Sequence, residues 1–351
     1  MIAMRNLRRA RILIVGAGDV GLRCIDRLHG RADRARVFAL TRRAERAAEL
    51  REAGAVPVAG DLDARASLAR LAGLANVVLH LAPPQKTGDE DGRTRRLIAA
   101  LCARRRSRAR PALAGMTRTA FGASRAFRTP RLAASAALKP TIVPERTRRS
   151  RRAPEPGKRL VYASTTGVYG DCGGARIDET RTVQPANARA IRRVSAERQL
   201  RRATARGALS ATIARIPGIY AANRLPLARL EKGTPALVEA DDVYTSHIHA
   251  DDLAAILLRM ATHGRPARTI HAADDSELRM GDYFDRVADA FGMARAPRVS
   301  RAQAERALDP VLLSFMRESR RLANTRLKRE LRARLRYPDV DTFLRTLPPR
   351  S

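Results

Sequence analysis

Short apolar runs alternate with amphipathic stretches over the first hundred residues of the chain. Runs of strand length lie at 12–15, 37–40, 56–59 and 77–81. Between them, 41–53 and 65–72 place apolar residues at helical spacing among arginines. This alternation predicts an α/β fold in which a doubly wound parallel sheet is connected by crossover helices.

Regular patterning resumes after a long interruption. RLVYAST, at 159–165, predicts a fifth strand, and 211–216 predicts a sixth. We expect helices at 188–205 and 252–262, and a helical end of the chain around 300–336. The elements predict a large sheet domain at 11–236 and a smaller substrate region at 237–346.

The interruption itself, at about 103–157, is rich in arginine and proline, and its acids are Glu145 and Glu155. It has no sustained period, so it predicts a disordered or loosely helical insertion. A basic RNA-binding arm is the alternative. Ligands of such sheets bind at the carboxyl ends of the strands. Because the insertion joins a helix to the start of a strand, we expect it to leave the sheet at the opposite edge.

Charge and cysteine content change this picture little. The net charge of +34 comes almost entirely from arginines scattered through the whole chain, so specific nucleic-acid binding is not expected. Cys24, Cys102 and Cys172 are far apart in sequence and lack metal-ligand spacing, which favours neither a disulfide nor a zinc site. No window reads as a membrane span or signal peptide, so we expect a cytoplasmic protein, compatible with a homodimer.

The first chemical motif is a glycine loop. Gly16, Gly18 and Gly21 form G-x-G-x-x-G directly after the first strand and at the opening of a helix. The first glycine permits a tight turn, the second lets a pyrophosphate approach the backbone, and the third lets helix and strand pack closely. The context predicts a dinucleotide-binding Rossmann loop, with an ordinary glycine-rich turn as the alternative.

The ends of the next strands predict which dinucleotide binds. The second strand ends in Thr41, Arg42 and Arg43, where a carboxylate would favour NAD, so cations beside a missing acid favour NADP, with NAD still possible. Asp61, after the third strand, is placed to accept a hydrogen bond from adenine or to cap a helix. Neighbouring positions complete the predicted cofactor site: Asp19, Val20, Leu62, Leu81 and Ala82.

By the fifth strand the chain resembles the NAD-dependent epimerase/dehydratase family, the extended and atypical short-chain dehydrogenase/reductases. The resemblance covers most of the chain outside the insertion. Its motifs are the glycine loop, Asp61, YASTTGVYGD at 162–171, RIPGIY at 215–220, IHADD at 248–252 and the terminal NTRLKRELRARLRYP.

The resemblance implies roles for several residues. Thr165, with Ser164 beside it, would hydrogen-bond a substrate oxygen. Pro217 and Gly218 would border the nicotinamide. His249 and Asp252 fall on a family motif and would either brace the substrate region or contact substrate.

One departure from the family pattern concerns proton transfer. The positions of the family's Tyr-x-x-x-Lys pair are held by Arg189 and Arg193. Arginine does not deprotonate in proteins, so neither residue can act as a general base. Two guanidinium groups one turn apart can instead clamp an anion or stabilise an oxyanion. Tyr169 and His80 remain as candidate bases, with a buried structural histidine as the alternative for His80.

The sequence therefore predicts an NADP-binding oxidoreductase or isomerase that acts on a small sugar-derived or anionic substrate. A cofactor-binding sensor or partner protein without turnover is the alternative. A nucleic-acid-associated protein that uses the basic insertion is a third.

Overall fold

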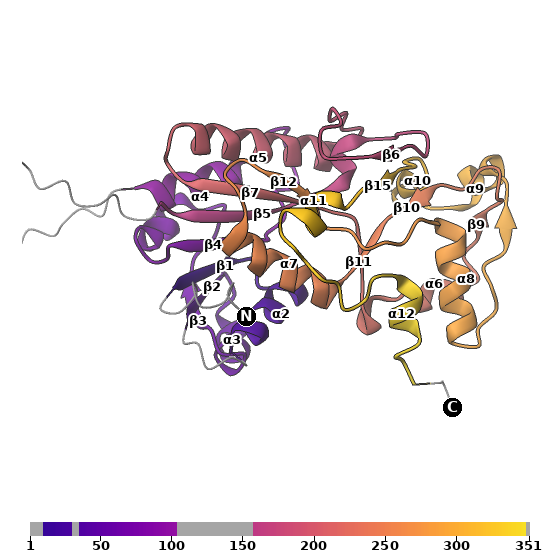
Figure 1. The fold of residues 1–351 in the computed structure, drawn as a ribbon, viewed down its shortest axis with the longest axis horizontal. Helices are drawn as coiled ribbons and strands as arrows, with labels where there is room; N and C mark the ends of the chain where they lie inside the picture. Colours follow the sequence, from indigo (N-terminus) through magenta and orange to yellow (C-terminus); the bar gives the residue numbers. More distant parts are fainter. Residues whose placement is uncertain (1–9, 30–34, 104–156, 349–351) are drawn as a thin grey trace, which may run out of the picture. The chain divides into compact units, whose positions relative to one another are not determined.

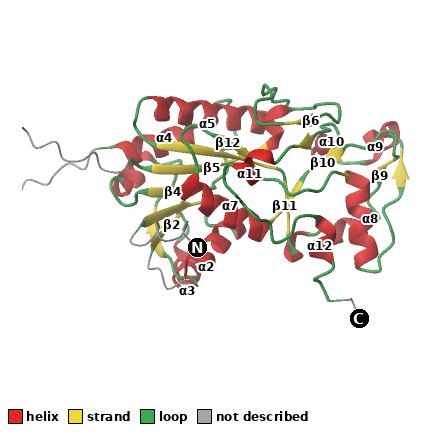
Figure 2. Ribbon diagram, in the orientation of Figure 1, coloured by secondary structure: helices red, strands yellow, loops and turns green. Residues whose placement is uncertain are grey.

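The computed structural model describes residues 10–29, 35–103 and 157–348. Within them a parallel sheet of seven strands has the order β12-β7-β5-β4-β1-β2-β3 (Figures 1 and 2). Its strands are β1 Arg11–Val15, β2 Arg36–Thr41, β3 Val56–Ala59, β4 Val77–His80, β5 Arg159–Thr165, β7 Ser210–Ile216 and β12 Thr269–His271. Six of them confirm the predicted strands, and β12 is a seventh that the pattern did not predict.

Helices cover both faces of this sheet. In β1, Ile12 and Ile14 join the core on one face, whereas Leu13 and Val15 join the core on the other, which is why the run is apolar throughout. On the first face lie α2 Asp19–His29, α3 Ala47–Glu52, α7 Ala250–His263 and α11 Thr325–Arg329. On the second lie the 3₁₀ helix η2 Arg65–Leu71, α4 Gly92–Cys102 and α5 Ala188–Ala205. The fold is the predicted doubly wound one.

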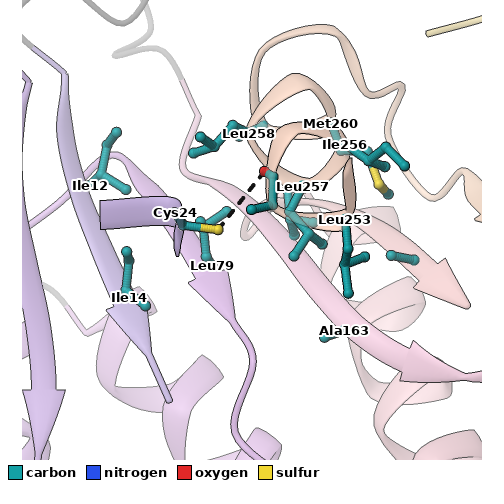
Figure 3. Packing of buried hydrophobic residues seen from close by; sticks show 14 of the residues in the cluster. Ile12, Ile14, Cys24, Leu79, Ala163, Leu253, Ile256, Leu257, Leu258 and Met260 are labelled. Carbon is teal, nitrogen blue, oxygen red and sulfur yellow. Dashed lines mark hydrogen bonds between the residues drawn. The ribbon is translucent and has the colours of Figure 1, made fainter. Parts of the chain in front are cut away.

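Cys24 illustrates how α2 and α7 pack together. Its sulfur lies 3.9 Å from the carbonyl oxygen of Ala254, in the cluster that contains Ile14 and Leu257 (Figure 3). Burial raises the pKa of the Cys24 thiol to about 12, so it stays neutral at physiological pH. All three cysteines are free. Cys24 therefore acts as a small apolar core residue.

A smaller region has a core of its own, built from side chains between Tyr220 and Leu344. Short strand pairs join distant segments here: β8 with β11, β9 with β14, and β10 with β13. The elements are β8 Gly218–Tyr220, α6 Leu227–Glu231, β9 Ala236–Leu237, β10 Tyr244–Thr245, β11 His247–His249, β13 Leu278–Arg279, α8 Met280–Ala290, β14 Arg298–Val299, α9 Arg301–Ala307, α10 Pro310–Phe315 and α12 Val340–Leu344. A fourth strand pair, β6 Arg176–Ile177 with β15 Arg321–Leu322, packs in a separate cluster with Val168 and Tyr169.

The boundary expected between 236 and 237 does not follow the sheet. Both α7 and β12 come after it in sequence, yet α7 packs in the core beneath the sheet and β12 pairs with β7. The chain thus returns to the large sheet after it has entered the smaller region. The limits 11–236 and 237–346 stay a prediction, in which α7 and β12 would have to be assigned to the sheet domain.

Three helical predictions differ in detail. The stretch at 65–72 is a 3₁₀ helix, in which Leu68 and Leu71 are buried at a spacing of three residues that suits this helix. The stretch at 41–53 contains a 3₁₀ turn, Ala44–Arg46, before α3. The end of the chain, expected to be helical around 300–336, consists of three short helices, α9, α10 and α11, and the strand β15 lies between α10 and α11 and pairs with β6.

The predicted insertion at 103–157 lies almost wholly outside the described residues. The described residues on either side of it are close together, because the Lys158 ammonium group donates a hydrogen bond to the carbonyl oxygen of Leu101 near the end of α4. Arg159 then pairs with Val77, the first residue of β4. These flanking residues therefore lie at the edge that holds the amino ends of the strands, where the sequence placed the start and end of the insertion. In the part of the chain that the structure describes, no helix has the length and apolar character of a membrane span.

Candidate active site

The glycine loop follows β1 and leads into α2. Gly16 has φ +97°, and a Cβ there would lie 2.5 Å from the backbone nitrogen of Ala82. A Cβ at Gly21 would lie 2.8 Å from the carbonyl oxygen of Gly16. Only glycine fits these two positions without a shift of backbone. A Cβ at Gly18, in contrast, would meet nothing within 4 Å, so open space lies in front of this residue.

That open space belongs to a cavity of about 420 Å³, called here the glycine-loop cavity. It lies at the carboxyl ends of β1 to β4, beside the point where the strand order reverses between β1 and β4. It gathers nine predicted cofactor residues: Gly16, Gly18, Thr41, Arg42, Arg43, Asp61, Leu62, Leu81 and Ala82.

Three further predicted residues of the loop and helix do not line this cavity. Gly21 acts through packing, as described above. Asp19 forms ion pairs with Arg23 at 3.1 Å and with Arg224 at 2.7 Å. Val20 packs against the core under α2.

The glycine-loop cavity is rich in arginine. Arg46 is paired with Glu49 at 2.8 Å, and Arg93 is paired with Asp63 at 2.5 Å. No carboxylate in the described ranges forms an ion pair with Arg42 or Arg43, both of which are exposed. The backbone nitrogen of Arg43 donates to the Thr41 hydroxyl at 3.2 Å, which holds this turn. Two guanidinium groups therefore remain for an anion at the end of β2.

Asp61 lines the same cavity and also shapes its own turn. One carboxylate oxygen accepts a hydrogen bond from the backbone nitrogen of Asp63 at 2.9 Å. The backbone nitrogen of Asp61 donates to the Ser67 hydroxyl at 2.9 Å. The helix that follows, η2, begins after Ala64 without a side-chain cap, so Asp61 does not take the helix-capping role considered from the sequence. The contact with adenine stays a prediction.

A second cavity of about 740 Å³, called here the large cavity, lies at the carboxyl ends of β5 and β7. Four predicted residues line it: Thr165, Arg189, Pro217 and Gly218. The backbone nitrogen of Gly167 donates to the Thr165 hydroxyl oxygen at 3.3 Å. The hydroxyl proton of Thr165 has no acceptor in the described part of the chain, so it is available to a ligand oxygen.

Ser164 and Tyr169 belong to a buried polar network behind the large cavity. Ser164 donates to Glu197 at 2.7 Å, and Arg215 donates to both oxygens of that carboxylate at 3.1 and 2.8 Å. Arg215 also donates to the Tyr169 hydroxyl at 2.7 Å, and this hydroxyl lies 2.5 Å from Nε2 of His271. Burial raises the pKa of Tyr169 to about 12. The Tyr169 phenol is therefore neutral at physiological pH, and neither Ser164 nor Tyr169 lines the cavity.

Arg193 is also engaged away from the large cavity. Its guanidinium donates to the Tyr162 hydroxyl at 3.1 Å and to the carbonyl oxygen of Ala163 at 2.6 Å. Arg189, one turn earlier in α5, lines the cavity instead. The clamp of two guanidinium groups inferred from their spacing is therefore not formed in this structure.

His80 is a buried residue with a local partner. Its Nε2 lies 2.9 Å from the Thr94 hydroxyl, which donates to the Asp91 carboxylate at 2.8 Å. Burial lowers the pKa of His80 to about 4, so the ring is neutral at physiological pH. It lines neither of the two cavities described above. The structural alternative considered for this histidine fits these contacts.

His249 and Asp252 brace the end of the chain. His249 caps α7, since its Nδ1 accepts a hydrogen bond from the backbone nitrogen of Asp251 at 3.2 Å. The two Asp252 oxygens accept from the backbone nitrogens of Arg336 and Tyr337 at 2.9 and 2.8 Å. Of the two roles that the resemblance left open, the contacts in this structure are those of bracing.

The far wall of the large cavity was not predicted from the sequence. It comes from the smaller region and includes Arg229, Tyr244, Thr245, His247, Met280, Tyr283, Phe284, Leu312, Glu318 and Arg320. These residues are spread over ninety positions on short elements, and no motif joins them. The periodicity of apolar residues along the sequence therefore cannot predict that these residues line one cavity.

Comparison with known proteins agrees with this geometry. Residues 137–273 match the sequence model of the NAD dependent epimerase/dehydratase family. The matched segment belongs to that family. It contains β5, α5 and β7, and with them Thr165, Pro217 and Gly218 of the large cavity. No protein of curated function matches the chain significantly.

Solved structures of the same fold include an epimerase and a dehydratase. A functionally unknown conserved protein from Silicibacter pomeroyi is 23% identical, with 95% of this chain and 96% of that one covered and a TM-score of 0.66. UDP-N-acetylglucosamine 4-epimerase from Bacillus cereus is 13% identical, with 95% and 96% covered and a TM-score of 0.64. DesIV, a dTDP-glucose 4,6-dehydratase from Streptomyces venezuelae solved with NAD and TYD bound, is 18% identical, with 96% and 95% covered and a TM-score of 0.65.

Proposed function

We propose that the protein binds NADP in the glycine-loop cavity, with NAD as the weaker ligand, and acts as an epimerase/dehydratase-like oxidoreductase or isomerase in the cytoplasm. Its substrate would be a small sugar-derived or anionic molecule in the large cavity. One observation carries the proposal: both cavities lie at the carboxyl edge of one sheet, the first at β1 to β4 and the second at β5 and β7.

The residues around the glycine loop fit a dinucleotide. Gly18 leaves open space where a pyrophosphate would approach the backbone, and α2 presents its amino end to that space. Arg42 and Arg43 favour NADP because their guanidinium groups can pair with a 2′-phosphate. Asp61 would accept a hydrogen bond from the adenine amino group.

Bound NADP would supply the hydride donor or acceptor, and the chain would supply binding and orientation. Thr165 is the residue we assign to the substrate, because its hydroxyl proton is available to a substrate oxygen. Arg189 lines the same cavity and would stabilise negative charge there. Ser164, Tyr169 and Arg193 are positioning residues in this proposal, since their side chains bind Glu197, Arg215 and Tyr162 instead of lining the cavity.

Titration of NADPH by its own fluorescence tests the proposal, because the chain contains no tryptophan that would interfere. Gly18→Val should abolish binding, since a branched side chain would fill the open space in front of the loop. Gly157→Val is the matched control: a Cβ there also meets nothing within 4 Å, but the residue precedes β5 at the opposite edge of the sheet. Equal NADPH affinity in the two variants, or no binding to the wild type, would contradict the proposal.

A further inference from the structure

The part of the far wall that α8 contributes to the large cavity is aromatic and aliphatic. Tyr283 and Phe284 lie next to each other on α8, with ring centroids 5.7 Å apart. The His247 ring stacks on Tyr283 at 4.3 Å between centroids. Met280 and Leu312 extend this surface. A ligand covered with hydroxyl groups would lose hydration against such a wall without recovering hydrogen bonds.

Arg229, on α6, is a half-buried cation in this apolar wall. Its guanidinium lies over the Phe284 ring at 4.2 Å, and Nη2 donates to the carbonyl oxygen of Pro235 at 2.9 Å. Its Nε is buried and has no hydrogen-bond partner among the residues that the structure describes. Burial lowers the pKa of Arg229 to about 10, so the group still carries its charge at physiological pH.

No carboxylate within the described ranges forms an ion pair with Arg229. The charge of Asp242 raises the pKa of Arg229. The carboxylate oxygens of Asp242, however, accept hydrogen bonds from the backbone nitrogens of Val243 and Gly281, both at 2.8 Å. In the same cavity Arg320 is paired with Glu318 at 2.8 Å. Partly burying a cation without a counter-ion costs free energy, and such a cost is typical of a ligand site.

Among the described residues, two more buried polar atoms without hydrogen-bond partners belong to side chains that line the same cavity. They are Oγ1 of Thr245 and Nδ1 of His247, two positions apart in the segment that leads from β10 into β11. Both residues line the large cavity, as does Arg229. Buried polar atoms of folded proteins are nearly always hydrogen-bonded, so three without partners around one cavity point to a missing polar group.

We propose that the large cavity binds an oxyanion, a carboxylate or a phosphate, carried on an apolar body. Arg229 would be its counter-ion, Thr245 and His247 would supply further hydrogen bonds, and the rings of α8 would contact the apolar part. This inference rests on the proposed function in that it names the substrate class of the same cavity. The volume of about 740 Å³ suits a small molecule of this kind.

Isothermal titration calorimetry with three probes tests the inference on the full-length protein, with and without NADPH. The probes are 3-phenylpropionate, its uncharged amide 3-phenylpropionamide, and phenyl phosphate, which distinguishes the two oxyanions. We expect saturable binding of at least one oxyanion and much weaker binding of the amide. Arg229→Gln should weaken oxyanion binding roughly tenfold to a hundredfold, the effect of one charged hydrogen bond, and leave NADPH affinity unchanged. Arg229→Lys should lose less, because it keeps the charge.

A control for the high net charge is essential, since a charge of +34 attracts any anion. Arg295→Gln removes the same charge from the surface, where Arg295 is 62% exposed and paired with Asp289. The inference is overturned if neither oxyanion binds the wild type, if both arginine variants lose equal affinity, or if UDP-N-acetylglucosamine binds more tightly than the phenyl compounds. NADPH binding without oxyanion binding would refute this inference alone, whereas oxyanion binding through Arg229 without dinucleotide binding would refute only the proposed function.

Discussion

Replacing Glu197 by glutamine would disrupt the buried ion pair behind the large cavity. The side chains of Glu197 and Arg215 are 1% and 4% exposed, and Arg215 donates to both carboxylate oxygens. Ser164 donates to the same carboxylate. Glutamine has one acceptor oxygen and no charge, so Glu197→Gln would leave the Arg215 guanidinium buried without a counter-charge.

The expected cost is large compared with the stability of a typical domain. Removing one partner of a buried ion pair costs about 3–5 kcal/mol, out of a total of roughly 5–15 kcal/mol. For a protein of this size the melting temperature should fall by on the order of 10 °C. Arg201→Gln is the control: Arg201 pairs with the same carboxylate at 3.0 Å but is 37% exposed, so its loss should cost less than about 1 kcal/mol.

The same pair predicts a pH dependence. Burial alone would raise the pKa of Glu197, but the hydrogen bond and charge of Arg215 outweigh it, and the net pKa lies below the ordinary value of 4.5. A lowered pKa means that the ionised carboxylate stabilises the fold fully above pH 4.5, and that this contribution is lost as the pH falls through the folded-state pKa. Urea unfolding at several pH values should therefore show the difference between wild type and Glu197→Gln shrinking in acid. The reasoning is refuted if Glu197→Gln costs no more than Arg201→Gln, or if the difference does not change with pH.

Three further predictions concern other parts of the chain. Replacing 104–156 by a short Gly/Ser linker should leave the melting temperature and NADPH affinity nearly unchanged, because Lys158 already contacts the end of α4; loss of soluble, NADPH-binding protein would contradict this. Asp252→Asn should destabilise the fold by about 1–3 kcal/mol in urea unfolding, since an amide has one oxygen for the two backbone nitrogens that the carboxylate binds, and an unchanged urea midpoint would argue against the bracing role. Arg42→Ala combined with Arg43→Ala should weaken NADPH far more than NADH in fluorescence titrations, whereas an equal loss for both would remove the argument for the 2′-phosphate.

The sequence by itself determined the sheet and the glycine loop. A parallel strand that is covered on both faces must be apolar at every position, so β1, β2, β4 and β5 appear as continuous runs whatever surrounds them. Gly16 and Gly21 stand where the backbone takes a positive φ or passes close to another backbone segment, and a glycine in the sequence by itself indicates such a position. The strand β12, at three residues, is too short to carry such a pattern.

Tertiary structure decided the site. Tyr169 follows β5 as predicted, but its hydroxyl is held by Arg215 from β7 and lies against His271 from β12, a strand about a hundred residues away. Arg189 and Arg193 are one turn apart on α5. Arg189 lines the large cavity, whereas Arg193 donates a hydrogen bond to Tyr162, because the two side chains meet different segments of the chain. The wall around Arg229 is assembled from short elements with no common period. Spacing along one helix or strand restricts which residues share a face, whereas the partner that each side chain meets depends on segments distant in sequence. The sequence therefore predicted the fold and the residues at the strand ends that line the two cavities, but not the partners of Tyr169 and Arg193 or the far wall of the large cavity.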